Sequence, residues 1–361
     1  MLIRLFVTHA QRRRWLPMAA LLVMHGCDAE AVSSADSDSL APVPDVVGEV
    51  AASDTLAPEE LEAIETGACE SGATEVLVPA LDGPQRIVTD GAFLYWTDDR
   101  GLWRSDLEGA GKVSLASDNN IRGLVVDGTH CYFGVFEQDI RRVSKVPGGA
   151  SEHFAGDAGH KVSNPTAFAI DATHVYWADA YFDSVSRAAL DGSGTTTLLE
   201  AKTRPCGIVA DEPSRLAINS TKVFWTTLDG QVGIASQDGT NALALVVPRA
   251  ELGGIAADET HVYWIGDGIY RANIDGSDIT LLAATAPSRR NGLVIDETRV
   301  YVLGRNGFGI VPKVGGPRID IAYPFDRPSN ATDLLVRDSA IIWTHDPGFA
   351  GDGAVLRTCI P

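Results

Sequence analysis

Three histidines occupy the same position in separate repeats of the sequence, and imidazole is a common metal ligand. His130, His174 and His261 each follow an aspartate by three residues, and three imidazoles would form a zinc site if the fold brought them together. Lys222 and Arg299 stand at the same position in other repeats, which is typical of an exposed turn. We therefore expect no metal site. The chain also lacks the motifs of phosphate-binding loops, metalloproteases and serine hydrolases, so no cofactor is expected.

Arginine and asparagine residues precede a series of short apolar segments, and such side chains bind anions and hydroxyl groups through forked hydrogen bonds. If the protein has a ligand, we expect an anionic or hydroxyl-rich group to bind where these segments begin. In the alternative interpretation, the arginines pair with carboxylates of neighbouring loops. The candidate ligand-binding residues are Arg86, Arg122, Asn164, Arg204, Arg290 and Asn291.

The apolar segments are parts of a repeat. Each segment has about four residues and mostly ends in aspartate, and an aromatic pair such as Tyr95-Trp96 or Tyr176-Trp177 closes about six residues later. Between Asp90 and Asp338 the copies recur about every 41 residues. The seven segments are Ile87–Asp90, Leu124–Asp127, Phe168–Asp171, Leu216–Asn219, Ile255–Asp258, Leu293–Asp296 and Leu335–Asp338.

Each repeat continues with a third strand that ends in a turn pair such as Asp191-Gly192, and then with a fourth apolar strand. Four short strands in about 41 residues predict a β-propeller blade. Residues 71–361 are therefore expected to form one all-β propeller of seven four-stranded blades. Six blades are the alternative. Residues 206–211, which also resemble a first strand, blur the count. Residues 74–79 have no blade of their own and are expected to complete the seventh, closing the ring with strands from both termini.

The aromatic pairs and the aspartates each have a structural and a functional interpretation. Aromatic side chains on second strands would bury a large area between blades, and we favour this packing over a ligand cage. The carboxylates that end the first strands are expected to accept backbone N–H bonds in Asx turns rather than to bind cations.

The repeats resemble the class B (YWTD) repeat of the low-density lipoprotein receptor family. Residues 95–98 read Tyr-Trp-Thr-Asp, and the best single unit, Asp171–Leu199, carries Tyr176-Trp177 and Asp191-Gly192. The resemblance covers roughly residues 76–358 and implies the propeller fold, although that family has six blades. Receptor-type ligand binding does not transfer residue by residue.

Composition restricts the classes of function. The net charge of −19 over 361 residues argues against nucleic-acid binding and against electrostatic docking on anionic lipid. The predicted inner strands are apolar, whereas propeller enzymes of the lactonase type carry carboxylates and asparagines there. We expect a non-catalytic binding propeller whose partner is a protein or a glycan. The alternative is a hydrolase or lyase that acts at the mouth of the central channel. The sequence leaves the oligomeric state open.

The N-terminus is typical of an export signal. Arg4 and Arg12–Arg14 precede a short apolar run that ends at Cys27, which resembles a bacterial lipoprotein signal. Residues 1–26 are the expected signal peptide, and Cys27 is the expected lipidation site. The acidic segment 27–70 contains no Lys or Arg and is expected to be a disordered tether. These features predict a lipid-anchored protein of the bacterial cell envelope, on the periplasmic or outer-membrane face, or alternatively a secreted protein.

Export makes disulfides chemically possible. Cys69 and Cys359 flank the two strands that are expected to close the ring, so we expect a bridge between them. Cys131 and Cys206 are expected to remain unbridged.

The lipid anchor is tested by the Cys27→Ser variant. We expect wild-type protein to fractionate with membranes and the variant to appear in the soluble fraction, because an acyl chain needs the thiol. Mass spectrometry of the mature N-terminus is the independent measurement, and a variant that stays in the membrane fraction contradicts the prediction.

Overall fold

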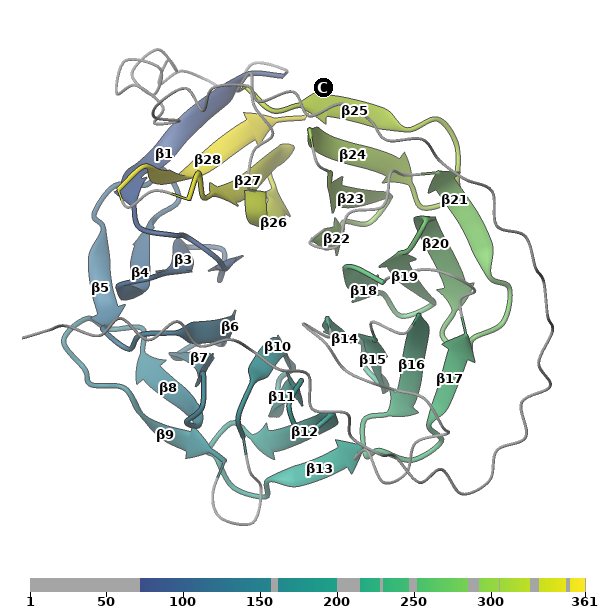
Figure 1. Ribbon diagram of the computed structural model, residues 1–361, viewed down its shortest axis with the longest axis horizontal. Helices are drawn as coiled ribbons and strands as arrows, with labels where there is room; N and C mark the ends of the chain where they lie inside the picture. The colour runs from purple at the N-terminus through teal and green to yellow at the C-terminus, as the bar shows by residue number, and fades with distance from the viewer. Residues whose placement is uncertain are drawn as a thin grey trace, which may run out of the picture. The chain divides into compact units, whose positions relative to one another are not determined.

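The computed structural model describes residues 72–156, 162–199, 215–227, 230–246, 252–284, 292–304, 306–324, 331–348 and 351–360. These residues form 28 strands in seven antiparallel sheets of four strands each, arranged as a ring of seven blades (Figure 1). The prediction of seven blades is therefore confirmed. The described residues contain no helix, and none that is long and apolar enough to cross a membrane is found among them.

In each blade the first strand faces the centre of the ring, and the following strands lie successively further out (Figure 1). The first three blades are β2 (Ile87–Thr89), β3 (Phe93–Asp98), β4 (Gly101–Asp106) and β5 (Val113–Ala116); β6 (Ile121–Val126), β7 (His130–Val135), β8 (Ile140–Ser144) and β9 (Glu152–Ala155); and β10 (Pro165–Ile170), β11 (His174–Asp179), β12 (Ser184–Ala189) and β13 (Thr196–Leu199).

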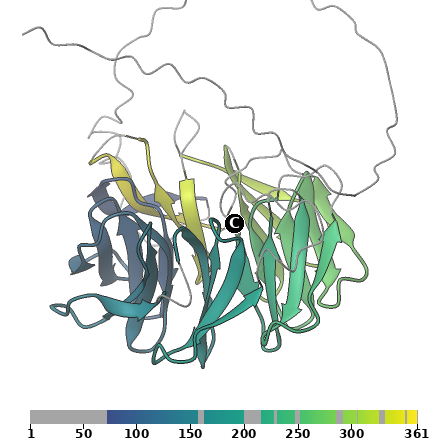
Figure 2. The same ribbon diagram turned by 60° about the horizontal axis from the view of Figure 1, so that its bottom comes forward.

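The strands run across the thickness of the ring, as the tilted view shows (Figure 2). Blades 4 to 6 are β14 (Leu216–Ile218), β15 (Lys222–Thr226), β16 (Gln231–Ser236) and β17 (Leu243–Val246); β18 (Ile255–Ala257), β19 (His261–Ile265), β20 (Gly268–Asn273) and β21 (Thr280–Ala284); and β22 (Leu293–Ile295), β23 (Arg299–Leu303), β24 (Gly307–Pro312) and β25 (Ile319–Ala322).

The seventh blade is built from both ends of the propeller. It contains β26 (Ala331–Arg337), β27 (Ala340–His345) and β28 (Gly353–Cys359), and its outer strand is β1 (Thr74–Leu81). β1 pairs antiparallel with β28, with Thr74 opposite Thr358. The side chain of Arg357 forms ion pairs with Glu75 of β1 and Glu108 of blade 1. The expected closure by strands from both termini is confirmed.

The apolar core lies between the blades. The buried apolar residues group into seven clusters within the described ranges, and each cluster joins two neighbouring blades. Trp96, Trp177, Trp264 and Trp343, all from second strands, are among the largest fully buried side chains. The packing interpretation of the aromatic pairs is therefore confirmed, because no ligand could reach these rings without separating two blades.

The aspartates that end the first strands organise the turns. One carboxylate oxygen of Asp90 accepts the backbone N–H groups of Ala92 and Phe93 at 2.9 and 2.8 Å, as the Asx-turn interpretation predicted. The other oxygen accepts the Tyr95 hydroxyl at 2.9 Å, a contact that the sequence analysis did not anticipate. The same aspartate–tyrosine hydrogen bond recurs in blades 2, 3, 5 and 6.

Side chains of the following blade reach two of these carboxylates. The Lys145 ammonium of blade 2 pairs with Asp90 of blade 1, and Lys313 Nζ of blade 6 lies 2.8 Å from Asp258 Oδ2 of blade 5. Each of these aspartates thus joins its own turn, a buried tyrosine and the neighbouring blade.

The repeated histidines are half-buried, so the expectation of an exposed turn position is wrong. His130 Nδ1 lies 2.8 Å from Thr129 Oγ1, and its ring packs against Tyr132 with 6.1 Å between the centroids. His174 and His261 make the same two contacts in their own blades. Among the described residues, no group of three or more His, Cys, Asp or Glu side chains is placed to hold a metal ion.

The Cys69–Cys359 bridge stays a prediction, because Cys69 lies outside the described residues. The Cys359 N–H donates to the Ala73 carbonyl at 2.9 Å, and the Gly72 N–H donates to the Cys359 carbonyl at 3.1 Å. Three residues of chain reach about 10 Å, so Cys69 is within range of Cys359. Cys131 is a buried free thiol in β7, and burial raises its pKa to about 12.

We expect non-reducing peptide mapping to recover a peptide that joins Cys69 to Cys359. Reduction should lower the free energy of unfolding by about 2–5 kcal/mol, because the bridge restrains the ends of the propeller. The internal control is Cys131, which should react with an alkylating agent only after denaturation. Recovery of Cys69 and Cys359 as free thiols would end this prediction.

The ion pair between Lys145 of blade 2 and Asp90 of blade 1 is tested by the pH dependence of stability. Burial opposes ionisation of Asp90, but hydrogen bonds from Lys145, from two backbone N–H groups and from Tyr95 outweigh it and lower its pKa to about 2. A carboxyl pKa lower in the folded than in the unfolded state stabilises the fold above about pH 4, and that stability is lost as the pH falls towards 2.

We therefore expect Lys145→Met to reduce the free energy of unfolding at pH 7 by about 1–2 kcal/mol. The difference from wild type should narrow as the pH falls from 4 towards 2. Denaturant titrations at several pH values measure both effects. The control is Arg337→Met, which breaks the exposed pair with Asp338 and should change stability by less than about 1 kcal/mol. Equal losses in the free energy of unfolding in the two variants would contradict a stabilising role of the Lys145–Asp90 pair.

Candidate functional site

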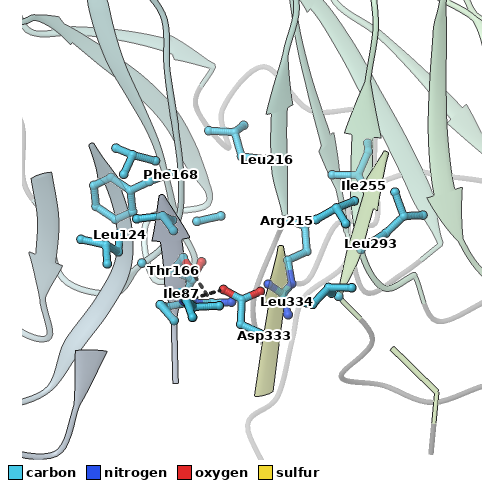
Figure 3. A pocket seen from close by; sticks show the side chains of 18 residues that line it. Ile87, Leu124, Thr166, Phe168, Arg215, Leu216, Ile255, Leu293, Asp333 and Leu334 are labelled. Atoms are coloured by element: carbon cyan, nitrogen blue, oxygen red, sulfur yellow. Dashed lines mark hydrogen bonds between the residues drawn. The ribbon is translucent and has the colours of Figure 1, made fainter. Parts of the chain in front are cut away.

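The first strands of the seven blades surround a central cavity of about 230 Å³. They lie at the inner edge of each sheet, so their side chains meet at the ring axis (Figure 1). One equivalent position in every blade carries an apolar residue, which gives the cavity an apolar ring (Figure 3). This ring consists of Ile87, Leu124, Phe168, Leu216, Ile255, Leu293 and Leu334.

The residue that precedes each member of the ring decides the polarity of the cavity at the end where the strands begin. Strand register establishes the equivalence, because Ile87, Leu216 and Leu334 pair with Trp96, Trp225 and Trp343 on their second strands. Three blades place a charged residue at the preceding position, namely Arg86, Arg215 and Asp333. The other four blades place Gly123, Ala167, Gly254 and Gly292 there.

The four small residues leave space at the centre of the ring for the side chains of the three charged residues. A Cβ atom on Gly123 would lie 2.1 Å from the Phe168 ring, and one on Gly292 would lie 2.6 Å from a Leu334 methyl group. A larger residue at either position would therefore displace the apolar ring. The cavity has charged groups at one end and an apolar wall beyond them.

Hydrogen bonds hold two of the charged residues in place. Arg86 Nη2 donates to the Thr166 carbonyl at 3.2 Å, and Asp333 Oδ2 accepts the Ile87 N–H at 3.2 Å. The Thr166 side chain is 8% exposed, and its hydroxyl has no hydrogen-bond partner. Thr166 lines the cavity beside these residues (Figure 3).

Arg215 has neither a hydrogen bond nor an ion pair from its guanidinium to any of the described residues. Its side chain extends towards the end of the cavity that contains Asp333 (Figure 3). Burial, followed by the positive charge of Arg86, lowers the pKa of Arg215 to about 10, and the Asp333 carboxylate opposes this shift. At neutral pH Arg215 is therefore a charged guanidinium with its forked donors unused.

The cavity lining combines one hydroxyl with three ionisable groups. Of the 18 lining residues, Thr166 carries the hydroxyl. Their ionisable side chains are Arg86, Arg215 and Asp333. Two guanidinium groups near one carboxylate carry a net positive charge, which suits recognition of an anion.

Only one of the six candidate residues from the sequence analysis is placed on the cavity. Arg86 lines it. Arg122 instead stacks on Phe136, with the guanidinium carbon 5.5 Å from the ring centroid. The backbone of Asn164 joins a turn, where its N–H donates to Asp179 Oδ2 at 3.1 Å. Arg204, Arg290 and Asn291 lie outside the described residues.

Sequence analysis missed Arg215, Asp333 and Thr166. Arg215 precedes Leu216 as Arg86 precedes Ile87, so the repeat alignment contained the signal for it. Asp333 was hidden because Asp338, the aspartate that marks the repeat in blade 7, stands one residue later than its counterparts. The register places Leu334 opposite Trp343, as it places Ile87 opposite Trp96. Nothing in the sequence distinguished Thr166.

A curated protein shares part of the repeat array. Over 142 residues the chain is 30% identical to the low-density lipoprotein receptor-related protein 5-like protein of Homo sapiens, a match that covers 36% of this chain and 53% of that protein. The chain resembles the YWTD repeat family. It spans about half the length of this curated relative, and no protein-family model matches the chain.

Solved structures share the fold of this YWTD-like propeller. YCF48, in a structure with a bound D1 peptide, gives a TM-score of 0.58 at 11% identity, covering 80% of this chain and 94% of that chain. The computationally designed protein Ika8 gives a TM-score of 0.56 at 14% identity, covering 77% of this chain and 83% of that chain. At such low identities these likenesses show the propeller fold alone.

Proposed function

We propose that this YWTD-like propeller is a non-catalytic binding module that works outside the cytoplasm, anchored through Cys27 or secreted. Its protein or glycan partner presents an anionic or hydroxyl-rich group to the end of the channel where the inner strands begin. The observation that carries the proposal is the pair of arginines, Arg86 and Arg215, in a cavity wall that apart from Asp333 and Thr166 is apolar or small.

The charge of the molecule supports this assignment of the binding face. The whole chain carries a net charge of −19, so two arginines close together on the axis create a local field of opposite sign. Such a field attracts an anionic group and orients it during encounter. Arginine holds carboxylate, sulfate or phosphate oxygens by two parallel hydrogen bonds, which sets the geometry as well as the strength of binding.

The relatives support a binding role without naming the partner. The curated relative is named as a low-density lipoprotein receptor-related protein, and one solved propeller of similar fold, YCF48, is bound to a peptide. Fold similarity alone does not transfer a ligand. The partner of this chain therefore has to be identified by capture, with variants that separate the channel mouth from the rest of the surface.

The experiment compares three forms of the full mature chain, each immobilised and exposed to membrane and secreted fractions of the producing cells. The first form is wild type. The second carries Arg86→Gln and Arg215→Gln at the channel mouth. The third carries Arg318→Gln and Arg337→Gln, which removes the same charge from residues that pair with exposed Asp320 and Asp338.

We expect a partner that wild type and the third form retain equally and that the mouth variant loses at least tenfold. Circular dichroism and thermal unfolding establish that all three forms fold. Capture that is unchanged in the mouth variant, or lost equally in both variants, would refute the assignment of the face. Turnover of an ester or lactone by wild type, abolished by the mouth substitutions, would refute the non-catalytic role and favour a propeller hydrolase.

A further inference from the structure

We propose that the central cavity binds a small monocarboxylate with a short aliphatic tail, with its carboxylate on Arg215 and its tail against the apolar ring. This is a small-molecule site within the propeller, and it does not depend on the partner binding proposed above. It follows from the unpaired Arg215, the neighbouring charge of Arg86 and the volume and wall of the cavity.

The first argument is the state of Arg215. Other arginines with described side chains pair with carboxylates, as Arg318 and Arg357 do, or donate to backbone carbonyls, as Arg86 does. Arg215 does neither in the described structure. It is half-buried and lines the cavity, so its donors are available to a ligand there. A carboxylate fits the fork of Arg215 by two parallel N–H···O bonds.

The second argument is a second guanidinium at the same end of the cavity. Arg86 comes from a different blade and lines the cavity, and its hydrogen bond to the Thr166 carbonyl holds it in place. Its positive charge acts on Arg215, so the two guanidinium groups together attract a carboxylate.

The third argument is the size and polarity of the rest of the cavity. A volume of about 230 Å³ is smaller than the 300–1,000 Å³ typical of drug-sized ligands. A ligand of a few carbon atoms is therefore the right size. Beyond the charged end the wall contains residues such as Leu216, Phe168 and Leu293, which favour an alkyl tail over a second charged group.

The charge of Asp333 distinguishes one carboxylate from two. Two guanidinium groups and one carboxylate give this end of the cavity a net charge of +1, which a monoanion neutralises. A dicarboxylate would leave its second charge against the apolar ring or near Asp333, and both positions are unfavourable. The site is therefore expected to prefer butyrate to succinate.

The test is calorimetric or NMR titration of the full mature chain with three probes: butyrate, the neutral isostere butyramide, and succinate. We expect butyrate to bind at least tenfold more tightly than either of the others. Arg215→Gln should weaken butyrate binding at least tenfold. Asp333→Asn, which keeps an acceptor for the Ile87 N–H and removes the negative charge, should strengthen it severalfold.

The matched control is Arg337→Gln, at the far end of inner strand β26, which should leave butyrate binding unchanged. Thermal unfolding without ligand establishes that each variant folds, and Arg215→Lys, which keeps the charge and loses the fork, serves if Arg215→Gln does not fold. The inference is overturned if wild type binds butyrate no better than butyramide. It is also overturned if Arg215→Gln and Arg337→Gln behave alike. Partner capture that is unchanged in the mouth variant, while wild type binds butyrate as expected, would refute only the proposed function.

Discussion

Burial of the second strands between neighbouring sheets is the constraint on which the propeller depends. A sheet that buries both faces against other sheets needs a neighbour on each side, and seven blades satisfy this only when the last meets the first. Each apolar cluster formed by the described residues spans two blades, so no blade has a core of its own. The pairing of β1 with β28 is therefore required, because without it one blade would lack its outer strand and the ring its closure.

The turn geometry that repeats from blade to blade follows from the same packing. A tyrosine buried between blades needs a hydrogen-bond acceptor for its hydroxyl. The aspartate that ends the first strand accepts this hydrogen bond, and its carboxylate also accepts the backbone N–H groups of the turn. Because that aspartate lies at the blade boundary, Lys145 and Lys313 reach it from the next blade. One residue thus satisfies a backbone turn, a buried phenol and an interblade contact, which explains why aspartate recurs there.

The chemistry of the channel is set by residues at positions that interblade packing does not constrain. The apolar ring is the last layer that the blades need for packing, and the residue before it faces the axis. Glycine or alanine suffices there in four blades, so Arg86, Arg215 and Asp333 are departures that interblade packing does not demand. Their charges, together with the unpaired hydroxyl of Thr166, make this layer the part of the molecule that gives the clearest indication of function.

The fold could be predicted from the local periodicity of the sequence. The candidate site could not, because it forms only when the ring closes. Four strands per repeat, the aromatic pairs and turn residues such as Asp90 could be predicted because their spacing lies within about 41 residues and each repeat confirms the next. The meeting of Arg86, Arg215 and Asp333 could not be predicted, because these residues are more than a hundred positions apart and come together only when seven inner strands share one axis. The contrast between Arg122 and Arg215 has the same physical cause. Arg122 lies within β6, two residues before its ring residue, and stacks on Phe136. Arg215 lies one residue before its ring residue and lines the channel.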